Sequence, residues 1–332
     1  MSRRARRSPR RTACTRGAGV ALLAAAALGL CGCHQPGFSS AATAAPPSTA
    51  HASLPDRTAA YLGVYEPGVP HSSQLIARFS QAAGRRPDIV LYYSGWPQKF
   101  QTPFARSARR AGATVLVDMD PSNVPIAAIA SGRYDVYLRS FADAVRAFSH
   151  PVIISFGHEM NGHWYSWGWT HTSPAVWVRA WRHIVTVFRR AGADNVTWLW
   201  TVNRLTASEG PIRDWWPGAA YVTWVGADGY LASPGDTFTR VFGPTITAVR
   251  ALTSKPVLIA ETAVGTEAGQ AAKIPGLFAG VRRNRLLGLV WFDEAQHGST
   301  YHQDWRLEGH PSAVRAFRRQ LRDYSYLVSP RP

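Results

Sequence analysis

Cysteine is confined to the first 33 residues of the chain, where it occurs at Cys14, Cys31 and Cys33. A folded part that begins beyond these positions has no internal disulfide to hold it together, whatever its compartment. Its stability must therefore come from a hydrophobic core. The residues from Leu54 onward are numerous enough to build one large domain with such a core.

Long apolar runs are also missing. The apolar stretch Ala18–Leu30 is shorter than the roughly 20 residues that a membrane-spanning helix needs, and it follows seven arginines. This order of charge and apolar residues is typical of an export signal. Leu30-Cys31-Gly32-Cys33 resembles a bacterial lipobox, in which Cys33 would carry the lipid, whereas an ordinary signal would be cleaved near Ala50 or Ala52. We therefore expect a protein that is exported and is either secreted or held at the cell surface as a lipoprotein.

Three segments follow from composition. Residues 1–33 are the predicted export signal, with the lipoprotein signal as its variant form. Residues 34–57 are rich in Ala, Ser, Thr and Pro and predict a disordered linker. Residues 58–328 are the predicted folded domain.

Acidic residues are scarce, because 20 Asp and Glu stand against 37 Lys and Arg, for a formal charge of +17. The signal holds seven of these arginines and no acid, which leaves +10 on the rest of the chain. Arginine pairs such as Arg85-Arg86 and Arg189-Arg190 come late in predicted helices or just after them, where cations complement the helix dipole. No nucleic-acid-binding signature is present, so nucleic acid is not an expected partner. Attraction to anionic wall polymers or lipid headgroups stays open.

Apolar runs that suit buried strands alternate with segments of helical period. The strand-like runs are Tyr61–Tyr65, Ile89–Tyr93, Thr114–Val117, Val152–Phe156, Val196–Trp200, Tyr221–Val225, Val257–Ala260 and Leu287–Phe292. The helical segments are Ser72–Ala83, Pro103–Ala111, Tyr134–Phe148, Pro174–Arg190, Thr239–Leu252, Gly269–Arg283 and Ser312–Asp323, with a short Pro211–Trp216 between the fifth and sixth runs. Eight such units predict a single-domain (β/α)8 TIM barrel, which we expect to be a monomer. A doubly wound sheet is the alternative, but no glycine-rich nucleotide turn follows the first run.

Chemistry in such barrels lies at the carboxyl ends of the strands. The fourth run ends in Gly157-His158-Glu159, followed by Asn161 and several aromatics, and the seventh run ends in Glu261. Cleavage of a glycosidic bond needs two carboxyl groups on either side of it, and aromatic faces stack on sugar rings. We therefore predict Glu159 and Glu261 as the catalytic pair, about 5–5.5 Å apart if the sugar configuration is retained.

Three segments carry a resemblance to a known family. Gly157-His158-Glu159-Met160-Asn161-Gly162-His163-Trp164-Tyr165 looks like the acid/base segment of glycoside hydrolase family 26, whose founding activity is β-mannanase. Leu258-Ile259-Ala260-Glu261-Thr262 resembles its nucleophile strand, and Val225–Tyr230 resembles the strand between them. The similarity covers most of residues 60–320. It departs from the family at Ser166-Trp167, where Pro-Trp is common, and at His163, where a small polar residue is usual.

The resemblance implies a retaining double displacement with Glu159 as acid/base and Glu261 as nucleophile. It places His158 and Trp164 at the subsite of the cleaved bond, Tyr230 on the nucleophile, and Trp291 as the floor under the reacting sugar. Further candidates for sugar contacts come from strand ends and from the aromatic cluster. They are Trp96, Trp167, Asn203 and Asp228.

Metals and cofactors are not expected. Asp118 and Asp120 resemble a pair of metal ligands, but no further ligand has suitable spacing, so a loop-stabilising or subsite role is favoured. His158 and His163 are five residues apart and do not form a His-Glu-x-x-His zinc motif. The absence of Gly-x-Ser-x-Gly argues against a serine esterase.

The sequence therefore predicts a retaining hydrolase of a β-1,4-linked polysaccharide, with β-mannan or glucomannan first. A mixed-linkage β-glucanase or xylanase of the same fold is the alternative. A catalytically dead barrel that only binds polysaccharide is a rival from another class, and a lipoprotein that acts on the cell's own envelope glycan is a second rival.

Overall fold

The computed structural model describes residues 54–295 and 302–324. The predicted export signal, the lipobox at Cys33, most of the predicted linker and the predicted end of the domain at residue 328 lie outside the described residues.

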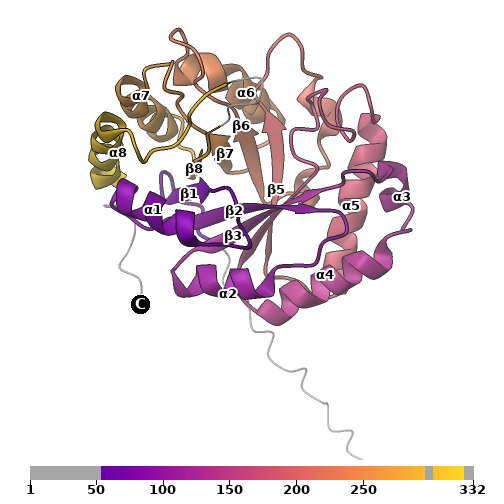
Figure 1. Ribbon diagram of the computed structural model, residues 1–332. Helices are drawn as coiled ribbons and strands as arrows, with labels where there is room; N and C mark the ends of the chain where they lie inside the picture. The colour runs from indigo at the N-terminus through magenta and orange to yellow at the C-terminus, as the bar shows by residue number, and fades with distance from the viewer. Residues whose placement is uncertain (1–53, 296–301, 325–332) are drawn as a thin grey trace, which may run out of the picture. The chain divides into compact units, whose positions relative to one another are not determined.

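Eight parallel strands close into a barrel in chain order, each hydrogen-bonded to the next and β8 to β1 (Figure 1). The strands are β1 Tyr61–Tyr65, β2 Ile89–Gly95, β3 Thr114–Asp120, β4 Val152–Phe156, β5 Val196–Asn203, β6 Trp224–Asp228, β7 Val257–Thr262 and β8 Gly288–Phe292. The predicted (β/α)8 barrel is confirmed, and the doubly wound alternative is wrong because the sheet has no open edge.

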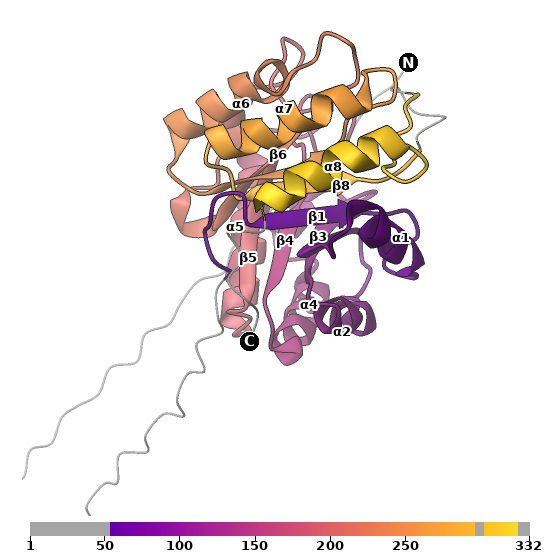
Figure 2. The ribbon, with the colours of Figure 1, turned by 90° about the vertical axis from the view of Figure 1, so that its left-hand side faces the viewer.

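Helices pack outside the strands, as Figure 2 shows for α7 and α8 beside β8. They are α1 Gln74–Ala83, α2 Thr102–Arg110, α3 Ile126–Ala130, α4 Asp135–Phe148, α5 Pro174–Arg190, α6 Phe238–Leu252, α7 Gln270–Arg283 and α8 Pro311–Tyr324. Between β5 and β6 the chain forms only the short 3-10 turns η1 Ile212–Trp215 and η2 Ala219–Tyr221, in agreement with the reduced segment predicted there.

The boundaries of five predicted strands differ from the structure in ways that matter for the site. The sixth strand was predicted at Tyr221–Val225 but runs from Trp224 to Asp228, because η2 occupies the start of the predicted run. Strands β2, β3, β5 and β7 extend two or three residues beyond their predicted ends. Several polar residues expected in loops are therefore fixed by strand pairing.

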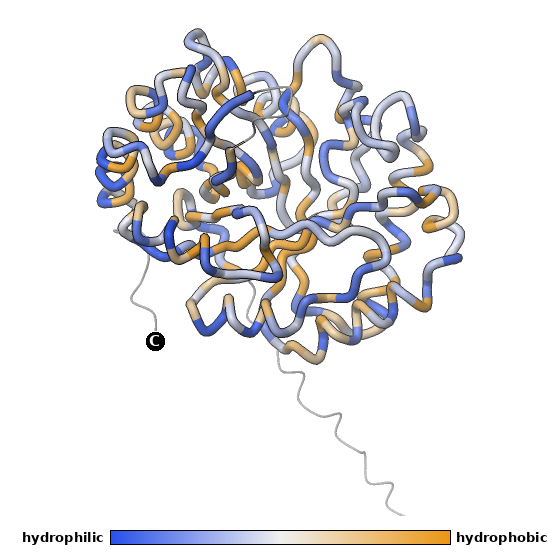
Figure 3. Tube along the Cα trace, viewed as in Figure 1, coloured by the Kyte–Doolittle hydropathy of each residue, from blue (hydrophilic) through white to orange (hydrophobic). Residues whose placement is uncertain are grey.

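Buried apolar side chains form two layers. One cluster draws on all eight strands and fills the barrel interior, with Leu91, Leu116, Leu199 and Val290 among its members. The larger cluster joins the outward strand faces to the helices. Figure 3 shows the same division, with hydrophobic residues on the strands and hydrophilic residues over the outer helix surfaces. Side chains along each strand alternate between the barrel interior and the helix layer.

The base of the barrel is covered by the first described residues. The Pro55 carbonyl accepts a hydrogen bond from the Tyr61 hydroxyl at 2.7 Å, and Asp56 accepts one from Trp224 Nε1 at 2.5 Å. The last part of the predicted linker therefore belongs to the folded domain. No helix within the described ranges is long and apolar enough to cross a membrane.

Candidate active site

Polar residues at the carboxyl ends of neighbouring strands lie in register. Asn203 on β5 pairs with Asp228 on β6, which pairs with Glu261 on β7. On the other side of the barrel, Tyr93 on β2 pairs with Asp118 on β3. All five positions lie at the same end of the barrel, so their side chains can contribute to one site.

A bulge in β7 directs Glu261 toward the barrel axis. Ala227 on β6 pairs with Ile259, whereas the next residue, Asp228, pairs with Glu261, so β7 holds one extra residue, Ala260. Such bulges re-aim side chains beside active sites. The interior position of Ala260 would send its neighbour outward in a regular strand, but the bulge allows Glu261 to point inward as well.

Two tyrosines hold the Glu261 carboxylate. The Tyr230 hydroxyl donates to Oε2 at 2.6 Å, and the Tyr93 hydroxyl donates to Oε1. The contact of Tyr230 agrees with the role that the family resemblance implied for it. Both phenol oxygens are buried beside this carboxylate, and burial followed by the charge of Glu261 raises the pKa of each tyrosine well above its usual value. Both therefore stay protonated and act as donors.

The chain turns sharply after β4 to present Glu159. Gly157 and Glu159 both have left-handed backbone conformations, with φ of 53° and 51°. A side chain at Gly157 would approach Trp177 Nε1 to 2.9 Å, so glycine is needed there for space as well as for conformation. The Glu159 amide donates to the Thr201 carbonyl at 3.0 Å, and its carbonyl accepts from the Gly162 amide at 2.8 Å. These bonds hold a conformation that is unfavourable for a glutamate.

Gly162 lets the next aromatic fold back over the turn. A Cβ at this position would lie 2.4 Å from the Trp164 ring, so only glycine leaves room for it. The Trp164 indole Nε1 then donates to Glu159 Oε2 at 3.0 Å. Trp164 remains 43% exposed, whereas Glu159 is 9% exposed. An exposed indole beside a buried carboxyl group offers a flat face to a sugar at that point.

The environment of Glu159 favours its protonated form. Burial first, and then the negative charge of Glu261, raises the pKa of Glu159 to about 8, although His158 and the Trp164 hydrogen bond act in the opposite sense. The contribution of Glu261 to this shift indicates that the two carboxyl groups lie near each other. A carboxyl group with such a pKa holds a proton at neutral pH.

His158 links the site to β3. Its Nδ1 lies 3.2 Å from Asp120 Oδ1 and 3.5 Å from Asp118 Oδ1, and its Nε2 lies 3.1 Å from the Tyr165 hydroxyl. Burial alone lowers the pKa of His158, but Asp118, Tyr165 and Asp120 outweigh it and raise the pKa well above the usual value. His158 is therefore an imidazolium that partly offsets the negative charge around Glu159.

Asn203 on β5 and Asp228 on β6 lie between β4 and β7, the strands that end at the two glutamates. Asp228 is fully buried, and neither of its carboxylate oxygens has a hydrogen-bond partner among the described residues. Burial, then Glu261 and Glu159, raises its pKa well above the usual value. The main chain of Asn203 exchanges two hydrogen bonds with the Asn161 side chain, at 2.9 and 3.1 Å. Asn161 of the Glu159 turn is thereby tied to β5.

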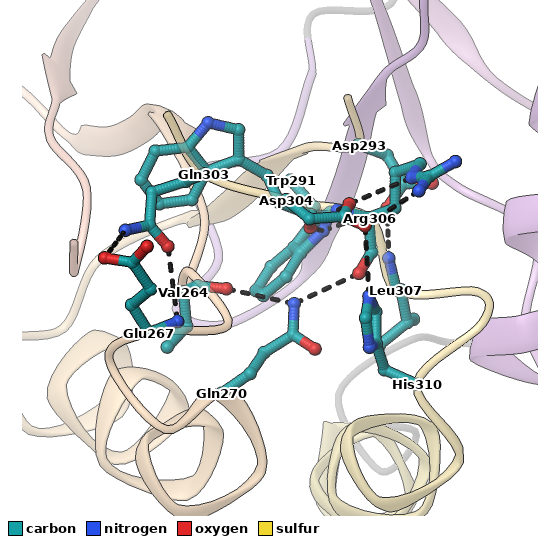
Figure 4. Close-up of polar contacts among 11 residues, drawn as sticks. Val264, Glu267, Gln270, Trp291, Asp293, Gln303, Asp304, Arg306, Leu307 and His310 are labelled. Atoms are coloured by element: carbon teal, nitrogen blue, oxygen red, sulfur yellow. Dashed lines mark hydrogen bonds and ion pairs between the residues drawn. The ribbon is translucent and has the colours of Figure 1, made fainter. Parts of the chain in front are cut away.

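The structure does not place Trp291 at the site. Trp291 points outward to the helix layer, with its ring 5.2 Å from Phe317 on α8, and it is fully buried. Its Nε1 donates to Asp293 Oδ1 at 3.1 Å and to the Trp305 carbonyl at 3.0 Å (Figure 4). The prediction of a sugar floor at Trp291 is wrong because strand alternation gives the inward position to Phe292, whose ring stacks on Tyr65 at 4.6 Å.

Two other predicted sugar platforms are packing residues. Trp167 is 2% exposed, lies parallel to Tyr165 at 4.2 Å and donates to the His158 carbonyl at 2.8 Å. It supports Tyr165 from beneath, so Tyr165 is the outer ring of that stack. The ring of Trp96 packs against Tyr137 at 4.6 Å, in the helix layer beside α4.

Two groups of acidic or histidine side chains have ligand atoms within 4.8 Å of one another, close enough to surround a cation. One is Asp118, Asp120 and His158, in which the histidine already contacts both aspartates. The other is Glu66, Asp293 and Glu308 near the junction of β1 and β8. The carboxyl groups of Glu66 and Asp293 are 1% exposed.

Sequence reasoning missed three residues that the structure brings to the site: Tyr93, Tyr165 and Phe292. Tyr93 was placed inside an apolar run, and its inward direction could have been found by counting in twos from Ile89 and Leu91. The same count from Val290 selects Phe292. Tyr165 stands in the predicted aromatic cluster, but only the stack with Trp167 shows which of the two is accessible.

The family model described as Glycosyl hydrolase family 26 matches residues 129–274, a range that includes Glu159 and Glu261. Endoglucanase H of Acetivibrio thermocellus is 29% identical over 271 residues, which cover 76% of this chain. A mannan endo-1,4-beta-mannosidase of Bacillus subtilis is 26% identical over 197 residues, which cover 53% of this chain. The chain spans only 29% and 51% of the lengths of these two relatives.

Among solved structures, the catalytic domain of a family 26 endo-beta-1,4-mannanase from Bacillus sp. JAMB-750 superposes with a TM-score of 0.63. The match covers 84% of this chain and 95% of that one at 14% sequence identity, which supports the shared fold alone. The matched family segment, the barrel, and the two glutamates at the ends of β4 and β7 agree with one another. The chain is therefore similar to glycosyl hydrolase family 26 over the segment that holds both glutamates, and it has the same fold as a solved member of that family.

Proposed function

We propose that the protein is a retaining glycoside hydrolase in which Glu159 is the acid/base and Glu261 the nucleophile. The observation that carries this proposal is the contrast between the two carboxyl groups. Burial and the neighbouring charge raise the pKa of Glu159 to about 8, whereas both oxygens of Glu261 accept hydrogen bonds from tyrosines. One group is suited to donate a proton and the other to attack.

The reaction would proceed in two steps. Glu261 attacks the anomeric carbon and the carboxylic acid of Glu159 gives its proton to the departing glycosidic oxygen, so that the glycosidic bond breaks as the ester bond to Glu261 forms. Glu159, now ionised, then takes a proton from water, whose oxygen attacks the anomeric carbon and releases Glu261. Both carboxyl groups return to their starting states, and neither a metal nor an organic cofactor is required.

Tyr93 and Tyr230 would serve as positioning residues for the nucleophile. They fix both oxygens of Glu261, so the attacking lone pair has a defined direction before the substrate arrives. His158 would reduce the repulsion between the two glutamates, because its positive charge is buried beside them. Trp164 would stack on the sugar at the cleaved bond, while Asp228 and Asn203 would contact sugar hydroxyls.

We propose a β-1,4-linked mannan or glucomannan as the substrate, with mixed-linkage β-glucan or xylan as the alternative. The support is that a mannan endo-1,4-beta-mannosidase and an endoglucanase are among the matched relatives. We also propose that the protein is exported and acts as a monomer, either secreted or attached to the membrane through a lipid on Cys33. The arginine-rich start and the apolar stretch that follows it support export.

The test compares wild type with Glu159→Gln and Glu261→Gln on mannan and on an aryl β-mannoside with a good leaving group. Both variants should lose several orders of magnitude on mannan. Azide should restore part of the aryl mannoside activity of Glu159→Gln, because that leaving group needs no proton. Glu267→Gln changes a glutamate that belongs to neither role and should keep the wild-type rate.

The stereochemistry of the first product provides an independent check. Proton NMR during early turnover should show the β-anomer, as expected for a double displacement. Initial release of the α-anomer would contradict Glu261 as nucleophile. A wild-type protein that binds mannan, glucan and xylan but hydrolyses none of them would instead support a barrel that only binds polysaccharide.

A further inference from the structure

Arginines collect at the end of the barrel opposite the two glutamates. In a (β/α)8 barrel the helices run antiparallel to the strands, so they end at the amino-terminal face, away from the carboxyl ends of the strands. Six helices have arginine in their last turn. These residues are Arg109 and Arg110 of α2, Arg146 of α4, Arg189 and Arg190 of α5, Arg250 of α6, Arg282 and Arg283 of α7, and Arg322 of α8.

Acidic residues at this face are few and mostly engaged. Asp88 pairs with Arg85 at 2.6 Å, and Asp143 pairs with Arg146 at 3.1 Å. Asp56 accepts from the Trp224 indole, Asp194 is exposed, and the side chain of Asp323 lies outside the described residues. The carboxyl end of the barrel is different, because most acidic residues lie there. They include Asp120, Glu209, Asp236, Glu261, Glu267, Glu294, Asp304 and Glu308.

The helix dipole alone does not account for this segregation. One cation near each helix end is enough to complement the dipole, and its effect fades within the last turn. Here α2, α5 and α7 end in two arginines each, and exposed Arg86 and Arg285 add to them after α1 and α7. Among the residues that the structure describes, Arg109, Arg110, Arg190 and Arg283 are exposed and have no acidic partner within 4.0 Å.

The chain also enters the barrel at this face. Pro55 and Asp56 bind the base of the barrel through Tyr61 and Trp224, and Asp56 shares a hollow with Arg250, Arg283 and Arg285. Cys33, the residue of the predicted lipobox, precedes Leu54 by 21 positions. If the predicted lipid on Cys33 and the predicted disordered linker are both present, the ends of a chain of that length would be on the order of 25 Å apart, so the arginines would lie near the bilayer surface.

We propose that the amino-terminal face of the barrel docks on an anionic lipid bilayer and holds the end with Glu159 and Glu261 away from the membrane. Exposed arginines on a broad face attract anionic headgroups within about a Debye length. The molecule is therefore oriented by its own field. A lipid on Cys33 strengthens this binding, because stable attachment of a protein usually needs two signals, but the docking does not depend on it.

The experiment uses residues 34–332, which keep the whole closed barrel and lack the apolar signal. Co-sedimentation with vesicles of phosphatidylglycerol and phosphatidylcholine in a 1:1 ratio is compared with pure phosphatidylcholine at low and high salt. We expect binding to the anionic vesicles only, and a loss of at least tenfold between about 50 and 500 mM salt because the arginines are exposed.

Charge reversal at either end of the barrel tests the orientation. Arg109→Glu with Arg110→Glu should lower the vesicle partition constant at least tenfold, and Arg190→Glu with Arg283→Glu should do the same. The matched control reverses exposed Arg133 and Arg240, which lie at the starts of α4 and α6 and so at the carboxyl end. This control has the same net charge and should bind nearly as well as wild type. Far-ultraviolet circular dichroism and hydrolysis of a soluble substrate should be unchanged in all three double variants.

Three results would overturn the proposal. Equal weakening by the control pair would show a general charge effect without a docking face. Binding to pure phosphatidylcholine that resists salt would show that arginine is not responsible. Binding to soluble polyphosphate without binding to anionic vesicles would show that the face binds polyanions and does not dock on a membrane.

Discussion

Trp164 Nε1 donates a hydrogen bond of 3.0 Å to Oε2 of Glu159, the residue whose pKa burial raises to about 8. A donor to a carboxylate stabilises its ionised form, so this bond lowers the pKa that burial alone would set. The same indole is the most exposed tryptophan at the site. One side chain thus combines the proposed stacking face for the sugar with an influence on the pKa of Glu159.

Replacement of Trp164 should therefore change the pH profile as well as the affinity. If Glu159 is the general acid, kcat/KM falls as pH rises through about 8, because the acid loses its proton. Trp164→Phe removes the donor, raises the pKa of Glu159 further and should shift the alkaline limb upward by up to about one pH unit. Trp96→Phe, in the helix layer, should leave the limb in place. A downward shift for Trp164→Phe would contradict the geometry.

Loss of either tyrosine on Glu261 should slow the reaction. A hydrogen bond to a charged group is worth about 1.5–3 kcal/mol, so Tyr93→Phe and Tyr230→Phe should each lower kcat/KM by roughly 10- to 150-fold. Tyr61→Phe is the control, because its hydroxyl bonds to Pro55 at the base of the barrel. Wild-type kinetics for Tyr93→Phe would show that the second tyrosine has no part in orienting the nucleophile.

Substitution of Phe292 should affect kinetics, whereas substitution of its neighbour Trp291 should affect stability. Phe292→Leu removes an inward ring near Tyr65 and Tyr230 and should raise KM or lower kcat/KM without a large change in melting temperature. Trp291→Phe removes the indole hydrogen bonds to the Asp293 carboxylate and the Trp305 carbonyl, although the Leu307 amide still donates to Asp293, and should cost about 1–3 kcal/mol of stability. Its KM should not change. Kinetics and thermal melts of both variants together test whether Phe292 points into the barrel and Trp291 toward the helices.

Alkaline conditions should destabilise the fold through Glu66 and Asp293. Burial raises the pKa of Glu66 to about 8 and raises that of Asp293 as well, with Glu308 beside both. Each folded-state pKa lies above the unfolded value, so the folded form holds protons that the unfolded chain has released above about pH 4.5. Stability therefore declines as pH rises toward each folded pKa, by about 1.4 kcal/mol per pH unit for each such proton.

Asp293→Asn should reduce this decline. Asparagine can keep its oxygen in place for the Trp291 indole and the Leu307 amide, which donates to Oδ1 at 2.7 Å, while it cannot ionise. Relative to wild type, its melting temperature should rise more at pH 9 than at pH 6. The exposed pair of Asp143 and Arg146 provides a comparison, since Asp143→Asn should have a small effect with no such dependence on alkaline pH.

The fold could be predicted from the sequence because the alternation of strand and helix segments repeats along the chain. The strand and helix alternation gave the barrel, and the turn after β4 and the end of β7 gave Glu159 and Glu261 as candidates, because polar residues after apolar runs stand out in sequence. The directions of Trp167 and Trp96 were not recoverable in this way, because neither residue lies on a strand. On a strand that is buried on both faces, hydrophobicity does not distinguish inward from outward, and the bulge at Ala260 changes the count without any signal in residue type.

Glu159 has a left-handed backbone conformation, with φ of 51°. At this position the requirements of thermal stability and of catalytic activity therefore conflict. Glycine there would relax the main chain and remove a carboxyl group from a dehydrated environment, so Glu159→Gly should unfold at a higher temperature while it cleaves nothing. Substitutions that raise the thermal stability of the active enzyme therefore have to lie elsewhere in the barrel, because a stabilising change at this position removes the proposed proton donor.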